Sequence, residues 1–129
     1  MTVLVGFLPT AEGEAAFRAG IDEAKRRGES LTLVNSPRAG APVTTSQADE
    51  ASLAALVAAA SEAGVELVVR QDPHEDDLAG TVLAIADEVD ASVIVIGLRH
   101  RSVVGKLLMG SSAQRLLLDS TRPVLAVKP

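Results

Sequence analysis

The sequence contains no cysteine, tryptophan or tyrosine, and its only aromatic residues are two phenylalanines among 129 residues. Without cysteine, the chain can form neither a disulfide nor a thiolate site. Because it lacks aromatic stacking platforms, we expect no nucleic-acid partner. No apolar run approaches the ~18–20 residues of a membrane-spanning helix, so we expect no membrane partner either. The length predicts one domain, residues 1–129, with a core of aliphatic side chains and alanine.

Charge is distributed unevenly, although the net charge is only −5. Residues 1–96 contain six Lys or Arg against sixteen Asp or Glu, whereas residues 97–129 contain six against one. The acidic first part argues against general nucleic-acid binding. The basic second part favours a local anionic ligand, although solvated surface cations would produce the same bias. No basic segment precedes the first apolar run, so we expect a cytoplasmic protein without a signal peptide.

Short apolar runs alternate with segments of helical periodicity along the chain. This alternation predicts an α/β fold, an open parallel sheet of five strands with helices on both faces. Ligands of such sheets bind beyond the carboxyl ends of the strands, where the strand order reverses. Periodicity alone leaves two orders open, the flavodoxin-like 2-1-3-4-5 and the Rossmann-like 3-2-1-4-5. We expect strands at 2–6, 30–35, 65–70, 92–96 and 123–127, and helices at 11–27, 47–63, 72–89 and 111–119.

Two of the expected helices begin with capping signals. Asp72 followed by Pro73 predicts that the third helix begins there, with His74 on the surface. Ser111 and Gln114 have the spacing of a capping box, which would cap the fourth helix without requiring any ligand.

The segment from Gly97 to Ser112 contains the most informative motif. It follows a buried strand and ends at a helix start, which presents free N–H groups and a partial positive charge to an anion. We expect Gly97 to let a ribose or phosphate approach the backbone, and Gly110, Ser111 and Ser112 to bind phosphate. A turn that needs a positive φ at Gly97 and a simple helix cap at Ser111 remain the alternatives. The combination of these positions in a basic segment favours a ligand site.

Three basic residues directly after this strand, Arg99, His100 and Arg101, are candidates to pair with ligand phosphates. Neither a complete Walker A loop nor a Gly-x-Gly-x-x-Gly fingerprint is present. The sequence also shows no nucleophile with an evident base and no metal-ligand set with recognisable spacing. We therefore expect no catalytic residue, no protein-bound metal site and no enzymatic activity.

The spacing of Gly97, Gly110 and Ser111 resembles the nucleotide-binding signature of the universal stress protein family. That signature reads Gly, two residues, Gly, nine residues, Gly, then Ser or Thr. The likeness covers essentially the whole chain, including the opening strand and the closing residues 122–127. It implies the strand order 3-2-1-4-5, an adenine nucleotide such as ATP, with or without Mg²⁺, as ligand, and a homodimer formed through the strand from Pro123 to Val127.

The resemblance also places Phe7 and Leu8, which follow the first strand, beside the nucleotide. Leu8 stands where members commonly carry an Asp that serves the adenosine part, and His100 stands where the signature has its second Gly. We therefore expect weaker binding than in members that keep both residues. Three functions remain open: an ATP-binding stress-response or signalling module, a dimeric interaction module without tightly held nucleotide, and a very slow ATPase. The matching phosphate half of the signature favours the first.

Overall fold

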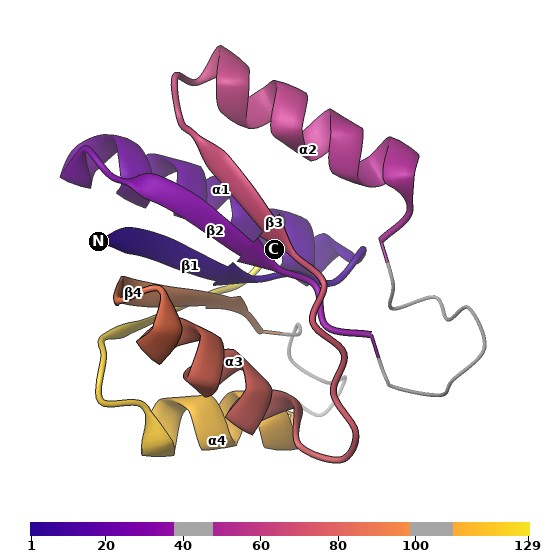
Figure 1. The fold of residues 1–129 in the computed structure, drawn as a ribbon, viewed down its shortest axis with the longest axis vertical. Helices are drawn as coiled ribbons and strands as arrows, with labels where there is room; N and C mark the ends of the chain where they lie inside the picture. Colours follow the sequence, from indigo (N-terminus) through magenta and orange to yellow (C-terminus); the bar gives the residue numbers. More distant parts are fainter. Residues whose placement is uncertain (38–47, 99–109) are drawn as a thin grey trace.

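A computed structural model describes residues 1–37, 48–98 and 110–129 of the chain. Within these residues, parallel strands form one sheet in the order β3-β2-β1-β4-β5, flanked by helices (Figure 1). The α/β fold predicted from the sequence is confirmed, and of the two strand orders left open by periodicity the Rossmann-like one is present. The strands are β1 Thr2–Gly6, β2 Ser30–Val34, β3 Leu67–Arg70, β4 Ala91–Gly97 and β5 Val124–Val127; the helices are α1 Ala11–Arg27, α2 Glu50–Glu62, α3 Leu78–Glu88 and α4 Ser111–Asp119.

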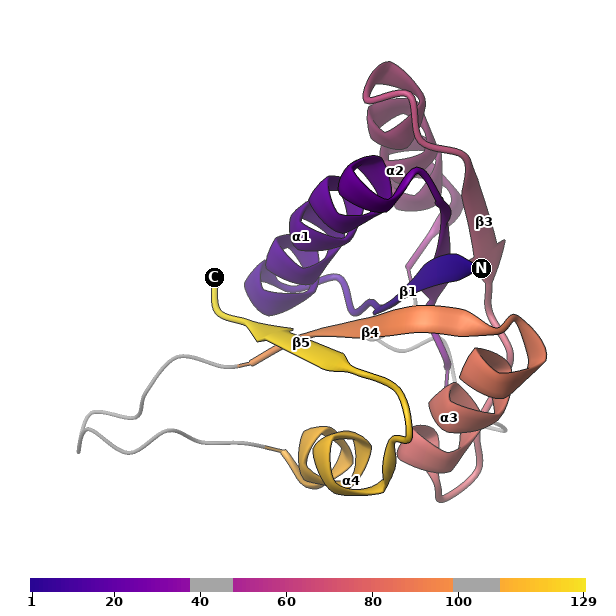
Figure 2. The same ribbon diagram turned by 90° about the vertical axis from the view of Figure 1, so that its left-hand side faces the viewer.

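The central strands are buried on both faces and contribute to two cores. On β1, Val3 and Val5 belong to the core under α1 and α2, whereas Leu4 belongs to the core under α3 and α4. On β4, Val95 likewise belongs to the core under α1 and α2, and Ile94 belongs to the core under α3 and α4. Figure 2 shows the sheet between these two pairs of helices. A strand covered on both faces carries a continuous apolar run, which explains why the sequence shows runs instead of alternation.

Helix α1 has a distinct chemical cause for each of its ends. At the start, Thr10 Oγ1 accepts a hydrogen bond from Gly13 N at 3.2 Å. At the end, Gly28 adopts the left-handed conformation, with φ 66°, and its N–H bonds to carbonyls of the last turn. In between, Gly20 brings the helix onto β1, because a Cβ there would lie 2.3 Å from Val5 Cγ2. The helix therefore packs directly on the sheet.

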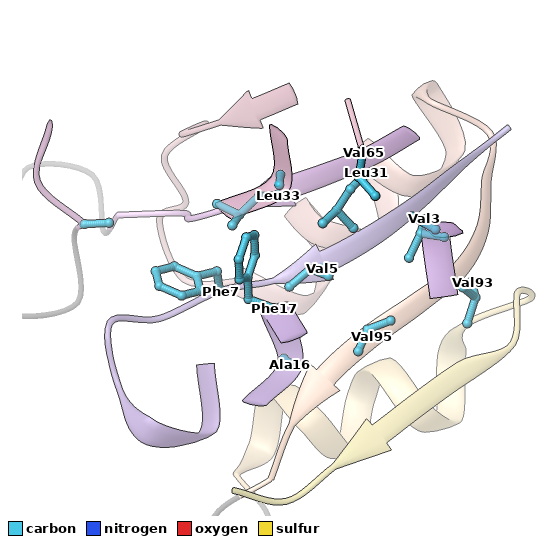
Figure 3. Close-up of a cluster of buried hydrophobic side chains, with 13 residues drawn as sticks. Val3, Val5, Phe7, Ala16, Phe17, Leu31, Leu33, Val65, Val93 and Val95 are labelled. Atoms are coloured by element: carbon cyan, nitrogen blue, oxygen red, sulfur yellow. The ribbon is translucent and has the colours of Figure 1, made fainter. Parts of the chain in front are cut away.

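The two phenylalanines occupy one end of the core under α1. Figure 3 shows the rings of Phe7 and Phe17 side by side, next to Leu33. Both rings are almost fully buried, at 4% exposure each. Phe7 therefore anchors the segment that follows β1 to the helix above it.

The buried side chain of Asn35 joins the segments that follow three neighbouring strands. Its Nδ2 donates to Phe7 O at 3.0 Å, and its Oδ1 accepts from Ala48 N at 2.9 Å and from Gln71 Nε2 at 3.0 Å. A buried amide left without such partners would cost about 1–3 kcal/mol. Asn35 thus fixes the carboxyl-end side of the sheet, where ligands bind in this class of fold.

Helix α3 begins later than the sequence predicts. Its N-cap is Asp77, not Asp72. Asp72 pairs instead with Arg70 at 2.7 Å, and this guanidinium lowers the pKa of the Asp72 carboxyl. His74 is half-buried, contrary to the predicted surface position, and its Nδ1 lies 3.1 Å from Ser36 Oγ. Tertiary contacts of the residues before α3 therefore override the local Asp-Pro signal.

Helix α2 also begins a few residues later than predicted, since Asp49 accepts a hydrogen bond from Ser52 N at 2.7 Å and caps it. Among the described residues, no helix is both long enough and apolar enough to cross a bilayer.

Candidate functional site

A cavity of about 330 Å³ lies beyond the carboxyl ends of β1 and β4, where the strand order reverses. This volume is within the range of small-molecule sites, roughly 300–1,000 Å³. The residues that line it come from the ends of β1, β2 and β4 and from α1, α3 and α4. Most of the larger side chains are aliphatic: Leu8, Val34, Leu78, Val82, Ile96 and Leu116.

The polar side of the cavity includes the start of α4. Gly110 is the N-cap of this helix and provides no side-chain acceptor, so Ser111 is the first helical residue and not the cap. The predicted capping box between Ser111 and Gln114 is therefore wrong. The first N–H groups of a helix have no intrahelical partner, and within the described part of the chain no side-chain cap bonds to those of α4. Since Gly110, Ser111 and Ser112 all line the cavity, this helix start can receive an anion.

Close packing of the end of β4 against α1 requires a glycine at position 97. A Cβ at this position would lie 2.0 Å from the carbonyl oxygen of Glu12. Gly97 is not among the described glycines with positive φ, so the alternative of a left-handed turn is wrong. The absence of a side chain lets the end of β4 contact the first turn of α1 directly. Gly97 still lines the cavity, but its identity has a structural cause.

Gly110 differs from Gly97 in this respect. Its φ of −65° is open to any residue, and a Cβ there would meet no atom within 4 Å among the described residues. Packing of the described part of the chain therefore gives no reason for glycine at 110. Free space next to an uncapped helix start is the arrangement that lets a ligand approach the backbone.

The remaining predicted site residues have different outcomes. Leu8 lines the cavity and is 37% exposed, so an aliphatic side chain stands at its rim. Phe7 also borders the cavity, but its ring belongs to the core under α1. Arg99, His100 and Arg101 lie outside the described residues.

Sequence reasoning missed two polar residues of the cavity, Glu12 and Ser36. Glu12 is in the first turn of α1, and Ser36 follows β2, so both lie on the carboxyl-end side of the sheet. Ser36 Oγ donates to Asp72 O at 2.6 Å. The available signal was position: Glu12 follows β1, one of the two strands at the reversal of strand order, and Ser36 follows β2, the neighbour of β1 in the sheet.

The N-cap of α3, Asp77, directly precedes the cavity residue Leu78. The Gly80 N–H, and after it Arg115, lower the pKa of the Asp77 carboxyl. The Asp77 carboxylate is therefore ionised at neutral pH, and it already accepts hydrogen bonds from Gly80 N and Arg115. In residues 1–37, 48–98 and 110–129, no group of three or more metal-ligating side chains occurs.

The sequence profile of the Universal stress protein family matches residues 1–128. The chain belongs to this family. A universal stress protein of Mycolicibacterium smegmatis is 42% identical over 127 residues, which cover 98% of this chain and 97% of that protein. A solved universal stress protein of Archaeoglobus fulgidus is 29% identical, with a TM-score of 0.81 and coverage of 98% and 97%.

Two more distant universal stress proteins were solved with nucleotides bound. One, from Archaeoglobus fulgidus, is a complex with dAMP; it is 24% identical, with a TM-score of 0.70 and coverage of 98% and 96%. The other is a complex with cAMP; it is 23% identical, with a TM-score of 0.74 and coverage of 99% and 96%. At these identities the likeness to the present chain establishes the fold.

We expect Gly97→Ala to lower the free energy of unfolding by about 1–3 kcal/mol, because the new methyl group must displace the backbone of α1. Urea denaturation measures this loss. The matched control is Gly6→Ala, whose Cβ would lie 3.8 Å from Ile96 Cγ2 in ordinary contact. It should change stability by no more than about 0.5 kcal/mol. Equal losses in both variants would contradict the packing role of Gly97.

Proposed function

We propose that the protein is a stress-response or signalling module that binds an adenine nucleotide in the cavity between β1 and β4. The observation that carries this proposal is the position of the uncapped start of α4 on the wall of an otherwise largely aliphatic cavity. The dAMP and cAMP complexes of structural neighbours support the same ligand class.

The cavity residues fit the two chemical parts of a nucleotide. Aliphatic side chains such as Val82 and Ile96 can bury a base, and the N–H groups and hydroxyls of Ser111 and Ser112 can bind phosphate. The proposed ligand is ATP or a related adenine nucleotide. Any Mg²⁺ would arrive on the phosphates, because Glu12 is the one carboxylate among the described lining residues and a protein-held ion needs more ligands.

A second candidate function is a dimeric interaction module that does not hold nucleotide tightly. Leu8 favours this alternative, because its aliphatic side chain stands at the cavity rim and offers no hydrogen bond to a sugar or base. Mass spectrometry of nucleotide extracted from the purified protein, followed by calorimetry, separates the two. Heat of binding with ATP or AMP supports the nucleotide module, and no heat at millimolar concentrations of either supports the alternative.

Gly110→Asp should change stability and nucleotide affinity in opposite directions. An Asp at the N-cap accepts hydrogen bonds from the first turn and should stabilise α4 by a few tenths to about 1 kcal/mol. The same carboxylate occupies the N–H groups proposed for phosphate and repels it, so nucleotide affinity should fall at least about tenfold. Thermal unfolding and calorimetry measure the two effects. Gly110→Ser is the uncharged control, with a smaller loss of affinity.

If Gly110→Asp binds nucleotide as tightly as the unchanged protein, the start of α4 does not hold the phosphate.

We propose binding without turnover. Among the described cavity residues, no carboxylate–metal set or activated nucleophile is present, and phosphoryl transfer depends on such groups for positioning and charge neutralisation. Phosphate release from ATP should therefore stay at the background rate. Robust multiple-turnover release that Gly110→Asp abolishes would show that the protein is an ATPase.

We propose a homodimer through the strand that starts at Pro123 and ends at Val127. Strand β5 is at the edge of the sheet, and among the described strands it pairs with β4 alone. Ile94 N donates to Pro123 O at 2.9 Å, and Leu98 N donates to Val127 O at 2.7 Å. Because alternate residues of a strand bond to the same neighbour, Val124 and Ala126 direct their backbone groups to the free edge. A two-fold axis would satisfy these groups by antiparallel pairing.

Ala126→Pro should convert the dimer into a monomer, because it removes an N–H from the free edge while leaving the bonds to β4. Light scattering at micromolar concentration measures the mass. Val57→Ala, on the 45% exposed side chain of a helix elsewhere, should leave the dimer intact. A monomer mass for the unchanged chain would refute the proposal. Leu125→Pro is unsuitable as a test, since the N–H of Leu125 faces β4.

A further inference from the structure

Glu12 is a half-buried carboxylate on the wall of the cavity. Within the described part of the chain, no hydrogen bond or ion pair engages this side chain. The other half-buried acidic side chains among the described residues are engaged: Asp72 pairs with Arg70, Glu23 with Arg26 and Arg27, and Glu29 accepts a hydrogen bond from Ser92. Partial burial of a charged group without a partner is unfavourable, so a bound ligand is a natural source of its hydrogen bonds.

The backbone of Glu12 is held firmly in place. Its carbonyl oxygen is in direct contact with the end of β4, where Gly97 leaves no room for a side chain. The next residue, Gly13, is packed as closely against Leu8, because a Cβ there would lie 1.7 Å from Leu8 O. Thr10 caps the same turn. Since the turn is fixed on both sides, Glu12 lines the cavity from a rigid element, as precise ligand recognition requires.

The helix dipole alone does not account for Glu12. Acidic residues are favoured in the first turn of any helix, and α1 carries a second one, Glu14, in the same turn. Glu14 is exposed and does not line the cavity. A solvated acidic side chain in the first turn therefore interacts with the helix dipole as favourably as one in the cavity wall. What distinguishes Glu12 is its place in the cavity.

The chemistry of the Glu12 carboxylate indicates which part of a nucleotide it can bind. An ionised carboxylate only accepts hydrogen bonds, and it repels phosphate. The phosphate is proposed to lie at the start of α4, whose first N–H groups receive no side-chain cap from the described residues, and the aliphatic side chains suit the base. The hydroxyls of the sugar, which connects these two parts, are strong donors. A carboxylate that binds ribose hydroxyls is also the usual solution in other α/β nucleotide sites.

We propose that Glu12 accepts hydrogen bonds from the sugar hydroxyls of the bound nucleotide, and that it makes the site prefer ribonucleotides over 2′-deoxyribonucleotides. This inference rests on the proposed nucleotide function and adds to it the residue that determines sugar specificity. Its removal should weaken the binding of AMP much more than the binding of dAMP, since only AMP has the 2′-hydroxyl.

The experiment compares the affinities of AMP and dAMP for the unchanged protein, Glu12→Ala and Glu14→Ala by calorimetry. The unchanged protein should bind AMP about tenfold or more tightly than dAMP, the factor expected for a hydrogen bond to a charged group. Glu12→Ala should reduce this ratio to near one by weakening AMP. Glu14→Ala, which removes the same charge from the same turn, should keep the ratio. If thermal unfolding shows that Glu12→Ala is misfolded, Glu12→Met takes its place, because it keeps the length of the side chain and removes the carboxylate acceptor.

Two results would overturn the inference while leaving the proposed function intact. One is equal affinity of AMP and dAMP for the unchanged protein. The other is an unchanged ratio in Glu12→Ala. If neither nucleotide nor ATP binds to the unchanged protein, the proposed function itself fails.

Discussion

The position of the cavity depends on the direct contact between the end of β4 and the first turn of α1. Gly97 lies against the backbone of Glu12 with no side chain between them. From β1 the chain passes through α1 on one face of the sheet, and the helix that leads from β4 to β5 is on the other face. The two connections therefore diverge at the strand reversal and leave a crevice there. The contact brings a carboxylate of α1 to the same crevice as the start of α4.

A second constraint keeps this edge of the sheet rigid. Asn35 bonds to the main chain of Phe7, and the ring of Phe7 is held in the core beside Phe17. Ser36, the next residue, is buried and bonded to the segment that precedes α3. The floor of the cavity is thus tied to a fully packed core and to a buried polar network. A preorganised wall of this kind lowers the ordering cost that a ligand has to offset on binding.

The polar groups of the cavity are divided by chemistry. Donors are concentrated at the uncapped start of α4, and the carboxylate acceptor is supplied by Glu12. The aliphatic residues contribute burial without hydrogen bonds. The family resemblance predicts an acidic residue in the segment after β1. Leu8 stands at that position instead. If the cavity binds a nucleotide, the acceptor comes from the helix that follows this segment.

Predictions from local signals were accurate where one element determines the outcome, and wrong where several elements compete. Helix α1 starts and ends as predicted, because Thr10 and Gly28 cap it by local geometry. The Asp-Pro signal at Asp72 failed, because Arg70 pairs with that carboxylate. The capping box at Ser111 failed as well, because the helix already begins there with Gly110 as its cap.

By itself, the sequence determined the number and order of strands and helices and the apolar runs that build both cores. These properties follow from the periodicity of neighbouring residues and from local capping. The resemblance at Gly97, Gly110 and Ser111 indicated which end of the sheet has the cavity. Only the tertiary structure decided that Gly97 serves the contact with α1 and that Glu12 and Ser36 line the cavity. Contacts between residues far apart in the chain depend on how the strands are ordered and how the helices cross them, and no local pattern encodes that arrangement.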